Sequence, residues 1–466
     1  MLPAPEVVDR ALRASRADEA MVIVTDAHEA SLRWAGNSMT TNGSSVSRDW
    51  AVVSVFRDGP NTARVGSVSS TSVDPADIDA VVRASETAAR TAEPARDAMP
   101  LLDPDAVDAD TLDKLLDWDG DPATTDIGVF TTLATDLAAG FDGADRLYGF
   151  AHHQMHSTWL GTSTGLRRRW VQPTGSVEIN GKRGAGAELA SAWVGTGTTD
   201  FADVDTPGLL AELARRLDWS KRHVDLPAGR YETLLPPSAV ADLMIYMAWS
   251  MEGRGAHEGH TAFSRAGGTR IGERLTGIPL TLSSDPSAAG LEYRPFVATV
   301  SSSESLSVFD NGLTAQRTDW IREGVIESLV YPRATAAEFD APVTVPGENL
   351  LMTGGGGEAT LPDMIARTER GLLLTCLWYI REVDPATLLL TGLTRDGVYL
   401  VENGEVTAAV NNFRFNESPL DLLRRVSEAG RTEITLPREW KDWFTRTAMP
   451  PLRIPDFHMS SVSQAT

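Results

Sequence analysis

The sequence predicts an α+β fold, in which a helix and antiparallel-sheet region is followed by a largely antiparallel β region. Apolar residues recur at helical spacing near the start of the 466-residue chain and again after Asp74. Apolar and polar residues alternate between Leu147 and Val194, which is typical of antiparallel strands with one buried face. From Gly268 onward the pattern is mostly that of strands. These three observations together indicate the α+β class.

The first hundred residues contain a predicted helix, several strands and a second helix. Residues 5–14 carry apolar side chains at helical spacing, and a second helix is expected to begin at Asp74, where acidic residues suit the positive end of the helix dipole. Between them we expect strands at residues 21–25, 31–34 and 50–57. This order differs from the strand–helix alternation of a nucleotide-binding domain.

Aspartates are concentrated between Asp97 and Asp145. A calcium-binding loop is one interpretation of the run that begins at Asp117, but an EF-hand needs glycine at the sixth loop position and glutamate at the twelfth. Counted from Asp117, Gly120 is the fourth residue and Gly128 the twelfth. We therefore interpret this stretch as a solvated acidic connector.

The second half begins after a sharp break at residues 227–230, where we place the main boundary. Beyond it we expect a strand at 231–235, an apolar helix from Ser238 to about Glu252, and a short helix at 361–366. Four consecutive glycines, 354–357, lack the Gly-Lys-Ser/Thr ending of a phosphate-binding loop. The predicted organisation is residues 1–95 (N-terminal α+β domain), 96–226 (acidic connector and middle region), 227–448 (C-terminal domain) and 449–466 (tail).

Composition excludes several classes of function. The formal net charge of −22 argues against binding to a nucleic-acid backbone or to an anionic membrane face. The first residues lack the pattern of a signal peptide, and no apolar run approaches the roughly 18 residues that span a bilayer. The single cysteine excludes an intramolecular disulfide. We therefore expect a soluble, cytoplasmic protein with no nucleic-acid or membrane partner.

Two histidine groups and the cysteine are candidate functional residues. His257 and His260, three apart, could share a metal on one helical turn, although the zincin motif requires a spacing of four. His152, His153 and His156 form the second group. On a strand, His152 and His156 would point the same way but lie about 13 Å apart, whereas on a helix they could share a metal. Cys376 lies in a predicted strand, where a free cysteine usually acts as a small apolar residue. The residues alone therefore identify no active site.

An ordered series of motifs nevertheless resembles the TldD/PmbA family of metallopeptidase-related proteins. The series covers Gly229 to Leu423 and consists of Thr261–Ser264, Phe309–Leu313, Arg317–Val325, Leu361–Leu373 and Tyr399–Val406. The first domain agrees through Asp58-Gly59, Gly66 and the helix after Asp74, and Ser163-Thr164-Gly165 resembles a middle-region pattern. The resemblance therefore extends over nearly the whole chain.

The resemblance implies which of two subunit types this chain is. TldD-like members carry His-Glu-x-x-x-His on a helix, and its histidines bind zinc together with a later cysteine. TldE-like (PmbA) members lack the motif and pair with a TldD-like chain. Here the motif positions are Met244, Ile245 and Trp249, followed by a matching Glu252-Gly253, while Cys376 occupies the cysteine position.

We therefore expect a TldE-like subunit that binds no zinc itself and has no catalytic residues of its own. The resemblance implies a dimer with a TldD-like catalytic subunit, which would hold the zinc, and peptides or unfolded polypeptides as substrates. Two alternatives stay open. One is an independent metallopeptidase with a displaced zinc site at His257, His260 and Cys376, with Glu258 as base. The other is a binding or scaffold protein of the same fold. Whether the dimer is formed with a partner or with a second copy is also open.

Overall fold

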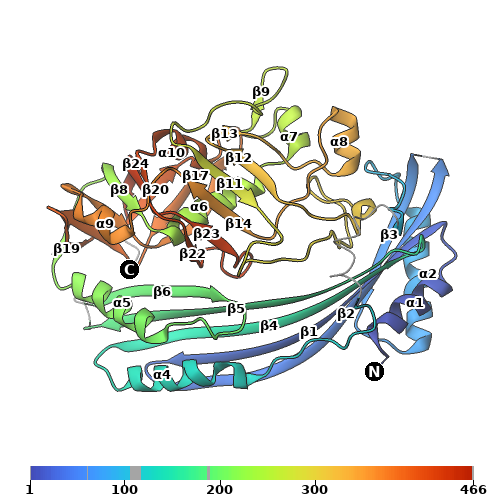
Figure 1. Cartoon of the computed structure of the whole chain (residues 1–466), viewed down its shortest axis with the longest axis horizontal. Helices are drawn as coiled ribbons and strands as arrows, with labels where there is room; N and C mark the ends of the chain where they lie inside the picture. The colour runs from blue at the N-terminus through green and yellow to red at the C-terminus, as the bar shows by residue number, and fades with distance from the viewer. Residues whose placement is uncertain (1, 60, 105–116, 186–188, 464–466) are drawn as a thin grey trace.

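A computed structural model describes residues 2–59, 61–104, 117–185 and 189–463. Its first half is built on a strongly curved antiparallel sheet of six long strands in the order β3-β2-β1-β4-β5-β6 (Figure 1). The strands are β1 (Glu19–Ala35), β2 (Met39–Gly59), β3 (Thr62–Ser70), β4 (Arg146–Thr162), β5 (Arg167–Arg183) and β6 (Ala190–Thr198). The strands of the N-terminal domain and those of the middle region therefore share one sheet.

Helices cover the convex face of this sheet, as Figure 1 shows. At one end lie α1 (Ala4–Ala14) and α2 (Pro75–Thr91), and at the other lie α4 (Thr131–Phe141) and α5 (Thr206–Trp219), with the short 3-10 helix η2 (Ile127–Phe130) before α4. Strand alternation explains the packing, because successive side chains point to opposite faces. Ala151, Val177 and Ile179 face α4 and α5 and are fully buried there. The intervening residues of β4 and β5 face the concave side.

The second half of the chain lies over the concave face of the curved sheet (Figure 1). Its largest sheet, ten-stranded within the described ranges, has the order β16-β17-β20-β24-β8-β15-β18-β19-β7, with β21 paired to β24. The strands are β7 (His223–Val224), β8 (Gly229–Leu235), β15 (Arg370–Leu374), β16 (Leu377–Asp384), β17 (Leu389–Thr394), β18 (Val398–Glu402), β19 (Glu405–Val410), β20 (Phe413–Glu417), β21 (Glu428–Ala429) and β24 (Leu452–Val462).

A smaller sheet has the order β13-β12-β11-β14-β23-β22. Its strands are β11 (Leu280–Ser284), β12 (Thr318–Arg322), β13 (Val325–Ile326), β14 (Leu350–Gly354), β22 (Glu433–Thr435) and β23 (Thr447–Met449). A separate hairpin is formed by β9 (Ser264–Arg265) and β10 (Gly268–Thr269). The remaining elements are α6 (Pro237–Trp249), α7 (Gly253–His257), η4 (Val308–Asp310), α8 (Arg333–Phe339), α9 (Leu361–Ala366) and α10 (Pro419–Arg425).

Helix α6 lies at the centre of the largest hydrophobic core. Its residues Val240, Leu243, Met244 and Ile245 are inaccessible to solvent and share one cluster with residues of both C-terminal sheets. A helix that is apolar on every side is typical of a buried element. None of the helices in the described ranges is long and apolar enough to cross a membrane.

The α+β prediction is confirmed, and the differences from the sequence analysis are mainly of extent. The predicted strands 21–25 and 31–34 form one continuous strand, β1, because it pairs along its whole length with β2 and β4. The acidic stretch contains helix α4, and its residues 105–116 lie outside the described ranges. Residues 452–462, which the sequence analysis assigned to a tail, form β24 between β20 and β8. Ile454, Phe457 and Met459 of β24 are buried.

Gly66 provides a test of the packing between β3 and α2. A Cβ atom at this residue would lie 2.2 Å from the backbone nitrogen of Ala89 and 2.4 Å from the carbonyl oxygen of Ser85, both on α2. Backbone atoms of a helix cannot move aside individually, so we expect Gly66→Ala to lower the free energy of unfolding by roughly 1–3 kcal/mol. Urea denaturation followed by circular dichroism measures the loss. Gly43→Ala in β2 is the matched control, since nothing lies within 4 Å of its Cβ position. If Gly43→Ala lowered the free energy of unfolding as much as Gly66→Ala, the packing argument would be contradicted.

Candidate functional site

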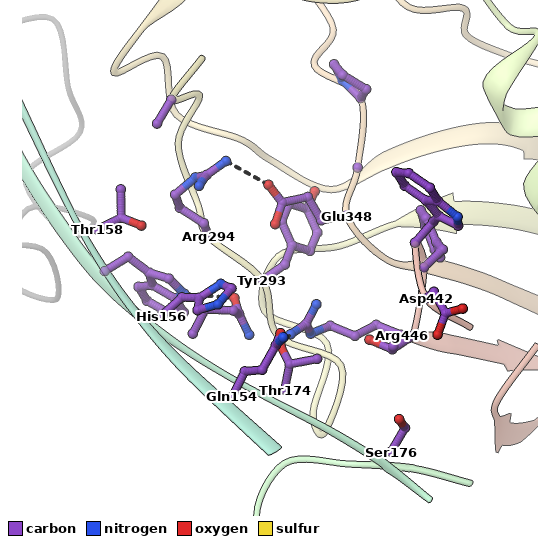
Figure 2. Close-up of a pocket in the computed structure, with 18 of the residues that line it drawn as sticks. Gln154, His156, Thr158, Thr174, Ser176, Tyr293, Arg294, Glu348, Asp442 and Arg446 are labelled. Carbon is purple, nitrogen blue, oxygen red and sulfur yellow. Dashed lines mark hydrogen bonds and ion pairs between the residues drawn. The ribbon is translucent and has the colours of Figure 1, made fainter. Parts of the chain in front are cut away.

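A cavity of about 930 Å³ separates the concave face of the curved sheet from the C-terminal half of the chain. Strands β4 and β5 form its floor, and three loop segments of the second half form the opposite wall. Figure 2 shows the side chains of both walls pointing toward a common space. The lining includes Phe150, His152, Gln154, His156, Trp170, Gln172, Thr174, Ser176, Glu178, Trp249, Tyr293, Arg294, Glu348, Lys441, Asp442, Trp443, Phe444 and Arg446.

The floor of the cavity follows from the alternation of the strands. Even-numbered residues of β4, from Phe150 to Thr158, and of β5, from Trp170 to Glu178, line the cavity. The odd-numbered neighbours Ala151, Val177 and Ile179 are buried under α4 and α5. One face of each strand is therefore apolar and covered by helices, while the other presents polar and aromatic side chains to an enclosed space.

Two of the three lysine and arginine side chains that line the cavity are paired with acids. Arg294 contacts Glu348 at 2.8 Å, and the Lys441 ammonium lies 3.2 Å from Glu178. Arg446 has no carboxylate within 4.0 Å among the described residues; it donates hydrogen bonds to the carbonyl oxygen of Pro173 at 3.0 Å and to the hydroxyl of Thr174. Burial lowers the pKa of Arg446 from its ordinary value, but a guanidinium remains protonated at neutral pH.

His152 and His156 both face the cavity, as expected for residues four apart on a strand. Each lies near Glu29 of β1, with nitrogen-to-oxygen distances of 3.9 and 4.0 Å. Burial is the main influence on both rings and lowers the pKa of each, whereas Glu29 acts in the opposite direction. The two imidazoles are therefore neutral at pH 7, and each offers one hydrogen-bond donor and one acceptor.

The three positions aligned with the zinc-binding motif have different environments. Met244 and Ile245 lie on α6 with no exposed surface, inside the apolar core. Trp249, the last residue of α6, is 43% exposed and lines the cavity. Its ring packs edge-on against Trp440, with 5.1 Å between the ring centroids. None of these three side chains offers the nitrogen, oxygen or thiolate donor that zinc prefers.

Asp242, two residues before Met244, connects α6 to the wall segment of the cavity. The carboxylate is fully buried and accepts hydrogen bonds from the backbone N–H groups of Arg438, Glu439 and Trp440, at 3.2, 2.9 and 3.3 Å. The indole N–H of Trp440 donates to the backbone carbonyl of Asp242. Burial raises the pKa of Asp242 to about 8, against the influence of these three N–H donors. This contact fixes the chain just before Lys441 and Arg446.

The structure does not bring the three predicted metal candidates together. His257, on α7, stacks on Phe339 with 4.1 Å between ring centroids and lies 3.2 Å from the Tyr331 hydroxyl. The side chain of His260 is 71% exposed. Cys376 is buried between β15 and β16. Across the described residues, no three His, Cys, Asp or Glu side chains are grouped so that they could hold a metal ion.

Glu258, the candidate base of a displaced site, is held by arginines. It lies 2.9 Å from Arg96 and 3.5 Å from Arg254. The hydrogen bond from Arg96 is the main cause of its lowered pKa. A carboxylate stabilised in this way is a weak proton acceptor.

Sequence reasoning considered His152, His156 and Trp249 individually, but it did not place them in one cavity and did not consider Lys441 or Arg446. The alternation between residues 147 and 194 could have placed Gln154, Thr174 and Ser176 on one face, because they occupy even positions like His152. No local signal connects that face with the segment 441–446, which is more than 250 residues away in the chain.

Comparisons with known proteins agree over most of the chain. A model of the PmbA/TldA metallopeptidase C-terminal domain matches residues 228–461, and a model of PmbA/TldA metallopeptidase domain 1 matches residues 20–89. No curated protein is matched by the sequence.

Several solved structures have a similar fold. TldE from Thermococcus kodakarensis has a TM-score of 0.77 at 14% identity, with 98% of this chain and 99% of that chain covered. Two candidate modulators of DNA gyrase are also similar. The one from Bacteroides thetaiotaomicron has a TM-score of 0.75 at 16% identity, with 98% of each chain covered. The one from Thermotoga maritima has a TM-score of 0.74 at 14% identity, with 97% and 99% covered. At these identities the likeness is one of fold.

Cys376 is expected to be chemically inert in the folded protein. Burial raises the pKa of its thiol to about 12, so almost no thiolate is present at neutral pH. We expect a thiol-reactive disulfide reagent to label Cys376 only slowly under native conditions and rapidly in guanidinium chloride. If Cys376 of the native protein were labelled as fast as in the unfolded chain, the thiol would not be buried as described.

Asp242→Ala tests the connection between α6 and the wall of the cavity. The substitution leaves three N–H groups at residues 438–440 without their acceptor, so we expect the free energy of unfolding to fall by about 3 kcal/mol. We also expect faster proteolysis within residues 438–446, measured by limited digestion and mass spectrometry. Asp49→Ala, at an exposed aspartate of β2, is the control. An equally small effect of both substitutions would show that the wall segment does not depend on Asp242.

Proposed function

Because the chain belongs to the PmbA/TldD metallopeptidase family, we propose that it acts as the TldE-like subunit of a two-chain zinc peptidase. In this proposal a TldD-like partner binds the zinc and cleaves peptides or unfolded polypeptides, in the cytoplasm. This chain binds no catalytic zinc and forms part of the wall of the substrate chamber.

The observation that carries the proposal is the environment of α6. Met244 and Ile245 are buried in the core, and Trp249 packs on Trp440. The proposal therefore assigns α6 a packing role and leaves proton transfer and water activation to the partner. The fold likeness to TldE from Thermococcus kodakarensis agrees with this assignment.

The cavity supports a role in holding substrate. Zinc in the partner would supply the Lewis acid that polarises the scissile carbonyl and activates water. This chain's contribution would be to bind and orient the polypeptide, through the amide and hydroxyl groups of Gln154, Thr174 and Ser176 and the aromatic rings of Trp249 and Phe444. Polar groups and aromatic rings that converge on one enclosed space are typical of a ligand site.

Reconstitution with a TldD-like chain tests the proposal. We expect this chain to co-purify with a partner that contains His-Glu-x-x-x-His. We also expect the mixture to cleave an unfolded, fluorescently labelled polypeptide faster than either chain does alone. Substitution of the motif glutamate in the partner should abolish cleavage. Cys376→Ser in this chain should leave cleavage unchanged, since the proposal assigns the thiol no zinc.

Metal analysis of the isolated chain provides the opposing outcome. We expect well under one equivalent of zinc after purification without chelators. One equivalent of zinc that is lost on His260→Ala would overturn the proposal in favour of an independent metallopeptidase. Failure of every TldD-like candidate to bind this chain would favour a binding or scaffold protein.

A further inference from the structure

We propose that the cavity binds an oligopeptide by its free C-terminal carboxylate, with Arg446 as the residue that pairs with the carboxylate. The inference deepens the proposed function and rests on it for the peptide nature of the ligand. It assigns one binding contact to this chain, and no chemical step.

The positive charge of Arg446 is not balanced by a carboxylate within ion-pair distance among the described residues. Its two hydrogen-bond acceptors, the Pro173 carbonyl and the Thr174 hydroxyl, are both neutral. Glu348 and Glu292 influence it only from beyond ion-pair distance, and Glu348 is already paired with Arg294. A partly desolvated cation without a counter-charge is unfavourable, and an anion in the cavity would relieve this cost.

The guanidinium is also placed where a ligand can reach it. Figure 2 shows the Arg446 side chain extending across the cavity toward Thr174 and Gln154, below the ring of Tyr293. Only one of its terminal nitrogens makes the two hydrogen bonds to residues 173 and 174. The planar group therefore keeps N–H donors for the two oxygens of a carboxylate, a geometry in which arginine forms paired hydrogen bonds.

The charges of the other lining residues favour a ligand with one negative charge over a polyanion. The acids Glu178, Glu348 and Asp442 line the same space as Arg446. These acids are already paired with Arg294 and Lys441. One positive charge, that of Arg446, is therefore left for a ligand, which matches a single carboxylate better than a nucleotide or a polyphosphate. The rings of His152 and His156 add hydrogen-bonding groups without a positive charge, because burial lowers the pKa of each. This suits the amide groups of a peptide backbone.

The position of the cavity in the sheet favours recognition of a chain end. Strand β4 is paired on both sides, with β1 and β5, and β5 is also paired with β6 over residues 175–183. Along these paired parts of the floor a peptide finds no open strand edge to which it could add. Side-chain contacts to a terminal carboxylate are the alternative, with Trp249, Trp443 and Phe444 available to contact an apolar terminal side chain.

Peptides that differ only at their C-terminus test the inference. Fluorescein-labelled Ala-Ala-Ala-Phe would be titrated with the full-length chain, as the free acid and as the C-terminal amide, and binding followed by fluorescence anisotropy. We expect the free acid to bind at least roughly tenfold more tightly than the amide, because the amide loses the charge-assisted hydrogen bonds. An amidated Ala-Ala-Glu-Phe peptide separates a side-chain carboxylate from a terminal one and should bind as weakly as the first amide. Inorganic phosphate at the same ionic strength should compete poorly.

Substitutions at Arg446 supply the second arm. Arg446→Gln should reduce binding of the free acid roughly tenfold and leave the amide unchanged, and Arg446→Lys should give an intermediate loss. Arg265→Gln, at an exposed arginine of β9, is the matched control and should bind like the unaltered chain. Thermal denaturation of each variant checks folding, and the comparison of acid with amide on the unaltered chain does not depend on any variant.

Three outcomes would overturn the inference. The free acid and the amide could bind with equal affinity, neither peptide could bind, or the glutamate-containing amide could bind as tightly as the free acid. These outcomes are distinct from failure of the proposed function. A mixture with a TldD-like chain that cleaves polypeptides while acid and amide bind equally would remove only the role of Arg446. Selective binding of the free acid without any partner assembly would remove only the two-chain peptidase.

Discussion

The buried carboxylate of Asp242 accepts hydrogen bonds from three consecutive backbone N–H groups, and the position of the cavity wall follows from this contact. Helix α6 is fixed by the apolar core on all sides, so Asp242 gives the segment 438–440 a rigid reference. Trp440 adds a second link, because its indole donates to the Asp242 carbonyl and packs on Trp249. Lys441 and Arg446 follow directly and are thereby held opposite β5. A buried carboxyl group needs hydrogen-bond partners of this kind, so the core helix and the wall of the cavity depend on each other.

The same helix carries apolar side chains at the positions where the family resemblance places zinc ligands. Where the family resemblance aligns a histidine and a glutamate, Met244 and Ile245 add to the core, and where it aligns the second histidine, Trp249 contacts Trp440 and the cavity. Polar ligands at the first two positions would need partners inside an apolar cluster. The apolar side chains of Met244 and Ile245 have no such requirement.

Much of the fold could be predicted from the sequence, because periodicity and turn residues are local signals. The helices beginning near residues 5, 75, 238 and 361, and the antiparallel strands between 147 and 194, lie close to their predicted places. The family resemblance is confirmed as well. The cavity could not be predicted, because its two walls come from residues 150–178 and 441–446, and no local pattern records that they meet. Strand β24 was assigned to a tail for a similar reason: its partners, β8 and β20, are distant or separated from it by other elements.

The central place of β24 has a consequence for the synthesis of the protein. During translation β8 is complete more than 200 residues before β24, and β20 is also made before it, so the edges that pair with residues 452–462 have no partner until those residues leave the ribosome. Unpaired edges of apolar strands are sites at which nascent chains associate wrongly. The final sheet therefore closes after translation of nearly the whole chain described here. Chaperones that shield strand edges would act on this half of the molecule, whereas the curved sheet of the first half can form while synthesis continues.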